Sequence, residues 1–117
     1  MTLTMKLFIA KNEDYILGSG RIQLLKSIRE LGSLRQAANL AGMSYRWAWA
    51  RLTKMEKALG FQLLVRGMRG KKRVAALTPE ADAIVDWYGE AEQEIGKLLI
   101  HLEARMPAPL KEALETG

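Results

Sequence analysis

The chain has 117 residues, a formal net charge of +5 and an isoelectric point near 9.7. This length allows one compact domain with an adequate core. No apolar run approaches the roughly 20 residues that span a bilayer, so we expect no membrane partner. The absence of cysteine excludes disulfides and thiolate metal ligands. The first residues turn acidic too early for a secretory signal, and we therefore expect a cytoplasmic protein.

The charge is unevenly distributed along the chain. Residues 19–78 contain 13 Lys and Arg against only Glu30 and Glu56, whereas residues 79–117 contain three basic and nine acidic residues. A basic body with an acidic C-terminal part suggests one face for a polyanion and another face with a different task. A solvated basic surface without a ligand is the alternative.

The first expected elements are a β-hairpin over residues 3–17 and a helix over 21–31. Four apolar residues alternate at the period of a half-buried strand: Leu3, Met5, Leu7 and Ile9. Residues 11–14 then suit a turn and 15–17 a short partner strand. In the helix, three apolar residues fall on one stripe: Ile22, Leu25 and Ile28.

Residues 33–59 carry the most informative pattern, two helices joined by a tight turn. Ser33 and Ser44 stand where an N-cap is needed for each helix. Gly42 suits a chain reversal with positive φ, and Gly60 suits the end of the second of these helices. Small residues let the two helices approach closely: Ala37, Ala38 and Ala41. The pattern predicts a helix-turn-helix.

The second helix of this motif has one apolar and one basic face. At 100° per residue, the apolar positions are Ala48, Leu52, Met55 and Leu59. The opposite face contains Arg46, Ala50, Thr53 and Lys57, flanked by Trp47 and Lys54. An α-helix fits the major groove of DNA, where Arg46 in the first turn can donate to guanine O6 and N7. Lys54 and Lys57 are expected to meet phosphate. An ordinary amphipathic helix with a solvated basic face is the alternative.

Other residues near this helix also qualify as DNA contacts. Ser33, Arg35 and Gln36 open the preceding helix, where backbone N–H groups favour phosphate. Tyr45 flanks the core and can direct its hydroxyl to a phosphate. Trp49 is expected to pack against the first helix or the base of the following hairpin. Trp47 lies nearer the exposed side, where it either contacts a thymine methyl or sugar or simply covers apolar surface.

Residues 61–78 are expected to form a β-hairpin, or wing, with strands over 61–66 and 73–78. The loop over 67–72 and its flanks are strongly basic through Arg66, Arg69, Lys71, Lys72 and Arg73. Such a tip can lie along phosphates or insert a guanidinium into a narrow minor groove. Phosphate contact is the favoured role, because it requires charge but no exact geometry.

The last expected helix covers residues 79–105 and is followed by a tail over 106–117. Thr78 suits the N-cap and Pro79 the first helical position, and we expect the tail to fray or form one turn. Six residues are spaced as the a/d seam of a dimeric coil: Ile84, Tyr88, Ala91, Ile95, Leu98 and Leu102. A two-fold dimer would place two recognition helices about one DNA turn apart, matching a palindromic operator.

Enzymatic functions have little support in the sequence. His101 is the only histidine, which excludes a histidine cluster or a histidine-based triad. The acidic residues of the last helix resemble a solvated face rather than a catalytic carboxylate pair. The glycine-containing loop of the wing lacks the spacing of a phosphate-binding loop. We expect no catalytic residue, metal, cofactor or identifiable small-molecule effector.

The sequence resembles the DNA-binding domain of ModE-like molybdate-responsive regulators, and more distantly the helix-turn-helix of LysR-type regulators. The similarity covers about residues 5–102 and is carried by Gly32-Ser33, Ala37-Ala38, Gly42-Met43-Ser44-Tyr45 and Ala48-Trp49. It implies a winged helix that binds an operator, with Ser44, Tyr45 and Arg46 at the groove. ModE-like proteins also carry C-terminal molybdate-binding domains, for which residues 1–117 leave no room. The resemblance therefore implies no molybdate ligand here, and the wing is shorter and more basic than is usual in the family.

The predictions combine into one hypothesis about fold and function. The fold is mainly α with small β elements, comprising a winged helix-turn-helix over residues 1–78, a dimerisation helix over 79–105 and a tail. The function is that of a sequence-specific transcriptional regulator that binds double-stranded DNA as a homodimer. A protein-interaction module or a non-specific architectural DNA-binding protein is the alternative.

Overall fold

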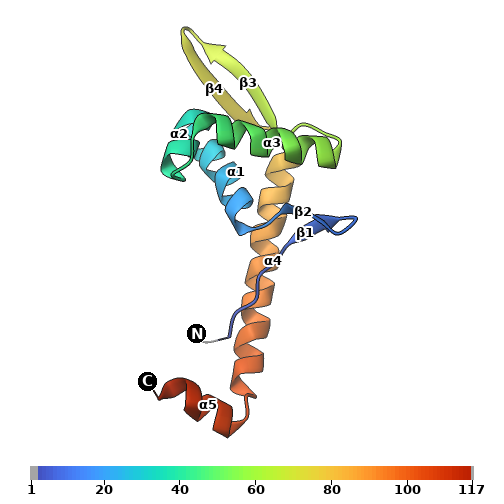
Figure 1. The fold of residues 1–117 in the computed structure, drawn as a ribbon, viewed down its shortest axis with the longest axis vertical. Coiled ribbons are helices and arrows are strands. Elements are labelled where there is room, and N and C mark those ends of the chain that lie inside the picture. The colour runs from blue at the N-terminus through green and yellow to red at the C-terminus, as the bar shows by residue number, and fades with distance from the viewer. Residues whose placement is uncertain (1–2, 117) are drawn as a thin grey trace.

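The computed structural model describes residues 3–116 of the chain, and helices dominate this part (Figure 1). In chain order its elements are β1 (Ile9–Lys11), β2 (Asp14–Leu17), α1 (Ser19–Leu31), α2 (Leu34–Leu40), α3 (Tyr45–Leu59), β3 (Leu64–Arg69), β4 (Lys72–Leu77), α4 (Pro79–Ala104) and α5 (Ala108–Glu115). A helical head carries two small hairpins, and α4 extends from it as a long stalk ending in α5 (Figure 1). The expected fold, mainly helical with small β elements, is confirmed.

The core lies where α1, α2 and α3 meet the first half of α4. The apolar stripe of α1 is buried, as are Leu52 and Met55 of α3. Ala37, Ala38 and Ala48 are completely buried, which lets α2 and α3 pack with their backbones close together. Burial of these side chains is the main force that holds the helix-turn-helix in shape.

Side-chain caps define the starts of the helices as the sequence predicts. The hydroxyls of Ser44 and Thr78 accept hydrogen bonds from backbone N–H groups in the first turns of α3 and α4, at 3.1 and 3.2 Å. Gly42 adopts a φ of +71° in the turn between α2 and α3, a conformation that glycine accepts at little cost. The turn therefore has the geometry that a helix-turn-helix requires.

The N-terminal hairpin is shorter than predicted. β1 and β2 contain three and four residues, and Asn12 and Glu13 form a tight turn with φ of +52° and +70°. Residues 3–8 form no strand and run beside α4 (Figure 1). The predicted strand over 3–9 is wrong for most of its length because no neighbouring strand is paired with it. The Leu7 carbonyl instead accepts a hydrogen bond from the Tyr88 hydroxyl of α4, at 2.8 Å.

The wing strands lie closer to the tip than predicted, because β3 covers residues 64–69 instead of 61–66 and β4 covers residues 72–77 instead of 73–78. β3 and β4 pair from Leu64 opposite Leu77 to Arg69 opposite Lys72, so the predicted six-residue loop reduces to Gly70 and Lys71. A two-residue turn that begins with a glycine at φ +64° matches the twist of the two strands. The strands therefore continue to this turn, and the basic residues lie along the hairpin rather than in a loose loop.

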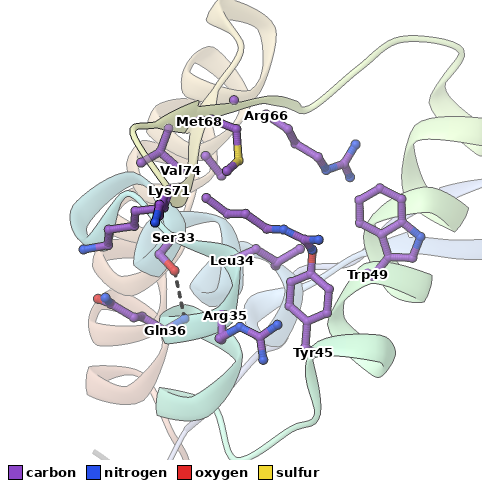
Figure 2. A pocket seen from close by; sticks show the side chains of 14 residues that line it. Ser33, Leu34, Arg35, Gln36, Tyr45, Trp49, Arg66, Met68, Lys71 and Val74 are labelled. Atoms are coloured by element: carbon purple, nitrogen blue, oxygen red, sulfur yellow. Dashed lines mark hydrogen bonds between the residues drawn. The ribbon is translucent and has the colours of Figure 1, made fainter.

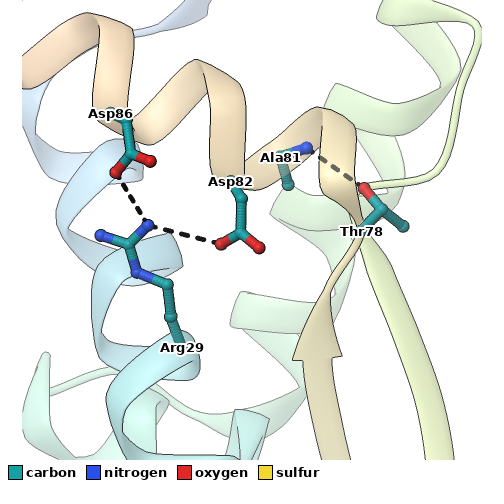
Figure 3. A network of polar contacts seen from close by, with 5 residues as sticks. All are labelled: Arg29, Thr78, Ala81, Asp82 and Asp86. Carbon is teal, nitrogen blue, oxygen red and sulfur yellow. Dashed lines mark hydrogen bonds and ion pairs between the residues drawn. The ribbon is translucent and has the colours of Figure 1, made fainter.

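Polar contacts attach the wing and α4 to the helical head. In β4, the Ala75 N–H donates to the Gly32 carbonyl at the end of α1, at 2.9 Å. At the start of α4, Arg29 of α1 contacts the carboxylates of Asp82 and Asp86, at 3.4 and 3.0 Å (Figure 3). Helix α1 therefore contacts both the wing and the stalk.

Beyond the head, α4 continues with little else packed around it. The described part of the chain measures 62 × 31 × 21 Å along its principal axes. The predicted tail contains α5, an eight-residue helix rather than frayed chain or a single turn. Among residues 3–116, no helix is both long enough and apolar enough to cross a membrane.

Candidate nucleic-acid interface

The outward face of α3 is a row of exposed side chains without acidic residues. It consists of Arg46, Ala50, Thr53 and Lys57, with Trp47 and Lys54 beside them. The predicted orientation of the helix is confirmed, because Ala48, Leu52 and Met55 point into the core. Arg46 has no carboxylate within 4.0 Å in residues 3–116. Its guanidinium is therefore free to bind an external acceptor.

A groove of about 670 Å³ lies between the wing and the starts of α2 and α3 (Figure 2). Arg35, Arg66 and three basic wing residues, Lys71, Lys72 and Arg73, line it, and none of its lining residues is acidic. The Arg35 guanidinium lies over the Tyr45 ring, 4.7 Å from the ring centre. The structure thus brings together residues from three elements, at a place where the N–H groups that open α2 also favour an anion.

Ser33 has a narrower role than predicted. Its side chain is only 7% exposed, and its hydroxyl accepts a hydrogen bond from the Gln36 N–H at 3.1 Å (Figure 2). This assigns Ser33 to the N-cap of α2. Arg35 and Gln36, which follow it, are exposed and remain the candidate contacts of this helix.

A cluster at the base of the wing connects it to α3. The Arg66 guanidinium lies over the Trp49 ring, 3.8 Å from its centre, so Trp49 packs against the wing base, one of its two expected positions. Arg66 therefore lies at the base and not at the wing tip, to which the sequence assigned it. On its other side, the Glu56 carboxylate lies 3.9 Å from Arg66. The same carboxylate accepts the N–H groups of Leu63 and Leu64 at 2.8 and 3.3 Å.

This cluster is a connection that sequence reasoning missed. Glu56 was counted only as one of two acidic residues in a basic region. The sequence spacing between Glu56 and β3 does not predict this contact, because the contact depends on the direction in which the chain leaves α3. Trp47, by contrast, is exposed as expected, with Arg51 over its ring at 5.1 Å from the ring centre. The indole thus lies on the same side of the molecule as the row on α3.

The structure corrects one residue of the expected dimer seam on α4. Tyr88 is 1% exposed and donates a hydrogen bond to Leu7. Burial, with smaller contributions from Glu92 and Tyr15, raises the pKa of its hydroxyl above the ordinary value. Tyr88 therefore belongs to the core of its own chain and is not available to a partner.

The exposed apolar face of α4 begins one residue earlier, at Trp87. Trp87, Leu98 and Leu102 are 51, 47 and 40% exposed. The remaining predicted seam residues, Ile84, Ala91 and Ile95, are half-buried, and Ile84 packs against the core. Trp87 was missed because it lies at the edge of the predicted stripe. Its spacing of four residues from Ala91 is the signal that could have found it.

The exposed row on α3 and the basic groove together have the features of a binding surface. In residues 3–116, no group of three or more His, Asp and Glu side chains could hold a metal ion. A three-helix head with a helix-turn-helix, followed by a two-stranded wing, defines the winged helix-turn-helix class of DNA-binding domains.

Comparison with known proteins identifies the family. The family described as bacterial regulatory helix-turn-helix protein, lysR family, matches residues 20–82, just over half of the chain. The chain belongs to this family, and the predicted resemblance is confirmed. This membership identifies the matched residues as the helix-turn-helix of a bacterial DNA-binding transcription regulator.

Two curated relatives extend the similarity toward molybdenum-related proteins. The molybdenum-pterin-binding protein MopB of Rhodobacter capsulatus is 31% identical over 99 residues, which are 84% of this chain and 37% of that protein. The transcriptional regulator ModE of Haemophilus influenzae is 39% identical over 74 residues, 62% of this chain and 29% of that protein. The chain thus spans about a third of the length of these relatives.

Solved structures show the same fold. The CbnR DNA-binding domain in complex with DNA aligns with a TM-score of 0.56 and 21% identity, covering 73% of this chain and 93% of that one. The BenM DNA-binding domain with catB site 1 DNA aligns with a TM-score of 0.55 and 18% identity, covering 83 and 93%. The predicted winged helix-turn-helix is therefore confirmed at the level of the fold.

Proposed function

We propose that this chain binds double-stranded DNA with α3 in the major groove, and that it does so as a homodimer on a palindromic operator. The observation that carries the proposal is the exposed row on α3, headed by Arg46, beside a basic groove that no carboxylate lines. The groove lies between the wing and the start of α3, the helix that carries this row (Figure 2). A DNA duplex presents base edges and phosphates side by side, so the row and the groove can contact both.

Base recognition is assigned to the first turns of α3. Arg46 can donate two hydrogen bonds to one guanine, which distinguishes this base from the others in the major groove. Ser44 and Tyr45 precede it, and Ala50 and Thr53 continue the row with side chains short enough to let the helix approach the bases. Trp47 adds an exposed ring for contact with a thymine methyl or a sugar.

Phosphate contact is assigned to the residues around the row. Candidates on the wing and α2 are Arg35, Gln36, Arg69, Lys71, Lys72 and Arg73, and those on α3 are Lys54 and Lys57. Such contacts release counterions, so affinity should fall steeply with salt, with a slope of about −0.9 per phosphate contacted. The stacked pair Trp49–Arg66 holds the wing at the angle that these contacts require.

The test of base recognition is binding of selected duplexes by wild type and Arg46→Ala, followed by fluorescence anisotropy at several salt concentrations. Base recognition is supported if Arg46→Ala loses about 1–3 kcal/mol of binding free energy, roughly 5- to 150-fold in Kd, on duplexes that carry the preferred base pair at one operator position. Duplexes in which that base pair is changed should bind the variant and wild type equally. The matched control is Arg105→Ala, at the far end of α4, which should bind as wild type does.

Two results would favour an alternative function over sequence-specific DNA binding. An equal loss on every duplex sequence means that Arg46 only contacts phosphate, which favours a non-specific architectural protein. No binding of wild type to any duplex at low salt rejects the proposal in favour of a protein-interaction module. The proposal assigns no cofactor to these residues, so molybdate added to the binding reaction should leave Kd unchanged.

Dimerisation is assigned to the exposed face of α4. Trp87, Leu98 and Leu102 place large apolar side chains in solvent along one face of a helix that the head does not cover, and exposed apolar surface of this kind indicates an interface. The proposed partner is a second copy of the chain, because two-fold symmetry brings the same apolar face of two α4 helices together, whether they run parallel or antiparallel. The resulting pair presents two copies of α3.

The dimer is tested by sedimentation equilibrium. Wild type should have twice the 13.1 kDa of the chain, and Leu98→Glu should shift the equilibrium toward the single chain. The control Ile100→Glu changes an exposed apolar residue on the opposite side of the same helix and should remain dimeric. A monomeric wild type at micromolar concentration would reject dimerisation while leaving DNA binding by a single head open to the first test.

A further inference from the structure

A second basic cleft lies on the other side of α3, away from the wing. It occupies about 570 Å³ between the N-terminal hairpin and the C-terminal half of α3. Four cations line it, Lys11, Arg21, Lys54 and Lys57, together with a single carboxylate, that of Asp14. We call it the hairpin cleft. None of its four cations has a carboxylate within 4.0 Å in residues 3–116.

Arg21 is the most constrained of these cations. Its guanidinium lies 4.5 Å from the centre of the Tyr15 ring and donates a hydrogen bond to the Ile16 carbonyl. Its Nε is buried without a hydrogen-bond partner. Partial burial lowers the pKa of Arg21 from its ordinary value. A positive charge held in this way, with no carboxylate beside it, is stabilised by an anion from outside the chain.

The hairpin is attached to α3 at the point where the cleft opens. The Lys11 ammonium donates a hydrogen bond to the Ala58 carbonyl near the end of α3, at 3.1 Å. Lys57 lies on the same helical face as Arg46, eleven residues later, or about 16 Å along the axis. Lys57 therefore belongs both to the exposed row on α3 and to the lining of the hairpin cleft.

The two basic hollows lie on either side of α3. In Figure 1 the wing is above this helix and the N-terminal hairpin is below it. A helix in the major groove, which is about 12 Å wide, has a phosphate backbone on each side. The groove beside the wing accounts for one of these backbones. The hairpin cleft has the charge and the position to meet the other.

We propose that the hairpin cleft binds a backbone phosphodiester of the duplex, on the side of the major groove away from the wing. The N-terminal hairpin thus acts as a second, shorter wing. This inference rests on the proposed function, because it places α3 in the groove. The chemistry it requires is that of a phosphate group, for which free inorganic phosphate is the other source.

The test measures the salt dependence of duplex binding by Lys11→Gln, because Lys11 lies in the N-terminal hairpin and is not among the phosphate contacts already proposed for α2, α3 and the wing. The variant removes one charge from an exposed position, and it should weaken binding of every duplex while lowering the salt slope by about 1. Lys97→Gln, an exposed lysine of α4, removes the same charge elsewhere and should keep the wild-type slope. Lys11→Arg keeps the charge and should keep the wild-type slope.

A variant of opposite sign provides an independent measurement. Asp14→Asn removes the one carboxylate of the hairpin cleft and should tighten binding at low salt. The duplex should also show protection from hydroxyl radicals on both backbones that border the recognised groove, with the hairpin-side protection reduced in Lys11→Gln. Thermal unfolding of each variant identifies any loss of duplex affinity that comes from a destabilised fold rather than from a missing contact with the DNA backbone.

Three results would overturn the inference or separate it from the proposed function. If wild type binds DNA and Lys11→Gln keeps the slope of Lys97→Gln, the hairpin cleft does not contact phosphate and only this inference fails. If inorganic phosphate at millimolar concentration shifts the NMR resonances of Tyr15 and Arg21 while the slopes remain unchanged, the cleft binds a free anion instead. If wild type binds no duplex, the proposed function itself fails.

Discussion

Glu56 offers the sharpest test of how the wing is held. Its carboxylate accepts hydrogen bonds from the N–H groups of Leu63 and Leu64, both of which are buried. The same carboxylate lies beside Arg66, which covers Trp49. The substitution Glu56→Ala removes the acceptor and leaves two backbone donors without a partner at the point where the chain enters the wing.

The magnitude follows from the two contacts. A buried N–H left without an acceptor costs about 1–3 kcal/mol, and the contact at 2.8 Å is stronger than the one at 3.3 Å. We expect Glu56→Ala to lower the free energy of unfolding by about 2–4 kcal/mol. Glu56→Gln keeps an acceptor oxygen but loses the charge, and should cost about 1 kcal/mol. For a domain of this size, the loss of unfolding free energy expected for Glu56→Ala corresponds to a fall in Tm of roughly 10 °C.

Urea unfolding, followed by tryptophan fluorescence, measures these differences at constant pH. The control is Glu30→Ala, which changes an exposed glutamate of α1 and should stay within about 0.5 kcal/mol of wild type. If Glu56→Ala unfolds at the same urea concentration as Glu30→Ala, the carboxylate does not hold the wing and the reasoning is refuted. Duplex binding by Glu56→Ala should weaken too, because the wing would no longer be held against α3.

Three further substitutions test local features of the fold. Tyr88→Phe removes the hydrogen bond to the Leu7 carbonyl and should cost about 1 kcal/mol at pH 7. Because burial raises the pKa of Tyr88 above 10.0, the wild type should lose stability as the pH rises past about 10, and the variant should lack this part of the alkaline loss. Ser44→Ala removes the cap that the Trp47 N–H uses and should cost about 1 kcal/mol. Gly60→Ala places a side chain at φ +84° and should cost about 1–2 kcal/mol.

Each of these substitutions has a measurement that can contradict it. Equal alkaline unfolding profiles for wild type and Tyr88→Phe would mean that the hydroxyl does not titrate differently in the folded chain. Ser44→Thr should retain most of the stability that Ser44→Ala loses, and equal losses would argue against a cap. Gly60→Asn should be tolerated better than Gly60→Ala, because asparagine adopts positive φ more readily.

Much of the fold follows from short stretches of sequence. The caps at Ser33, Ser44 and Thr78, the stops at Gly32 and Gly60, and the inward face of α3 depend on contacts within one or two helical turns. The residues that make these contacts are neighbours in the chain, so their spacing alone predicts them. The exposed row on α3 follows for the same reason, since it is the other side of the buried stripe.

The errors occur where the outcome depends on partners distant in the chain. The spacing of apolar residues in α4 predicts a stripe, but it does not tell which of Trp87 and Tyr88 is buried, because they differ by only 100° on the helix. The segment that covers Tyr88 lies about eighty residues earlier in the chain. The alternation over residues 3–9 indicated a strand, but a strand requires a neighbour to accept its hydrogen bonds. Arg66 was assigned to the wing tip because the pairing of β3 and β4 could not be read from composition.

Local sequence was thus sufficient for the helices, their ends and the side of α3 that faces away from the core, because these depend on interactions between near neighbours. The packing of the whole chain decided which aromatic residue of α4 is buried, which arginine covers Trp49 and which cations surround the hairpin cleft. These features join segments that are far apart in sequence, and their geometry exists only once the wing, the hairpin and the stalk have taken their directions from the helical head.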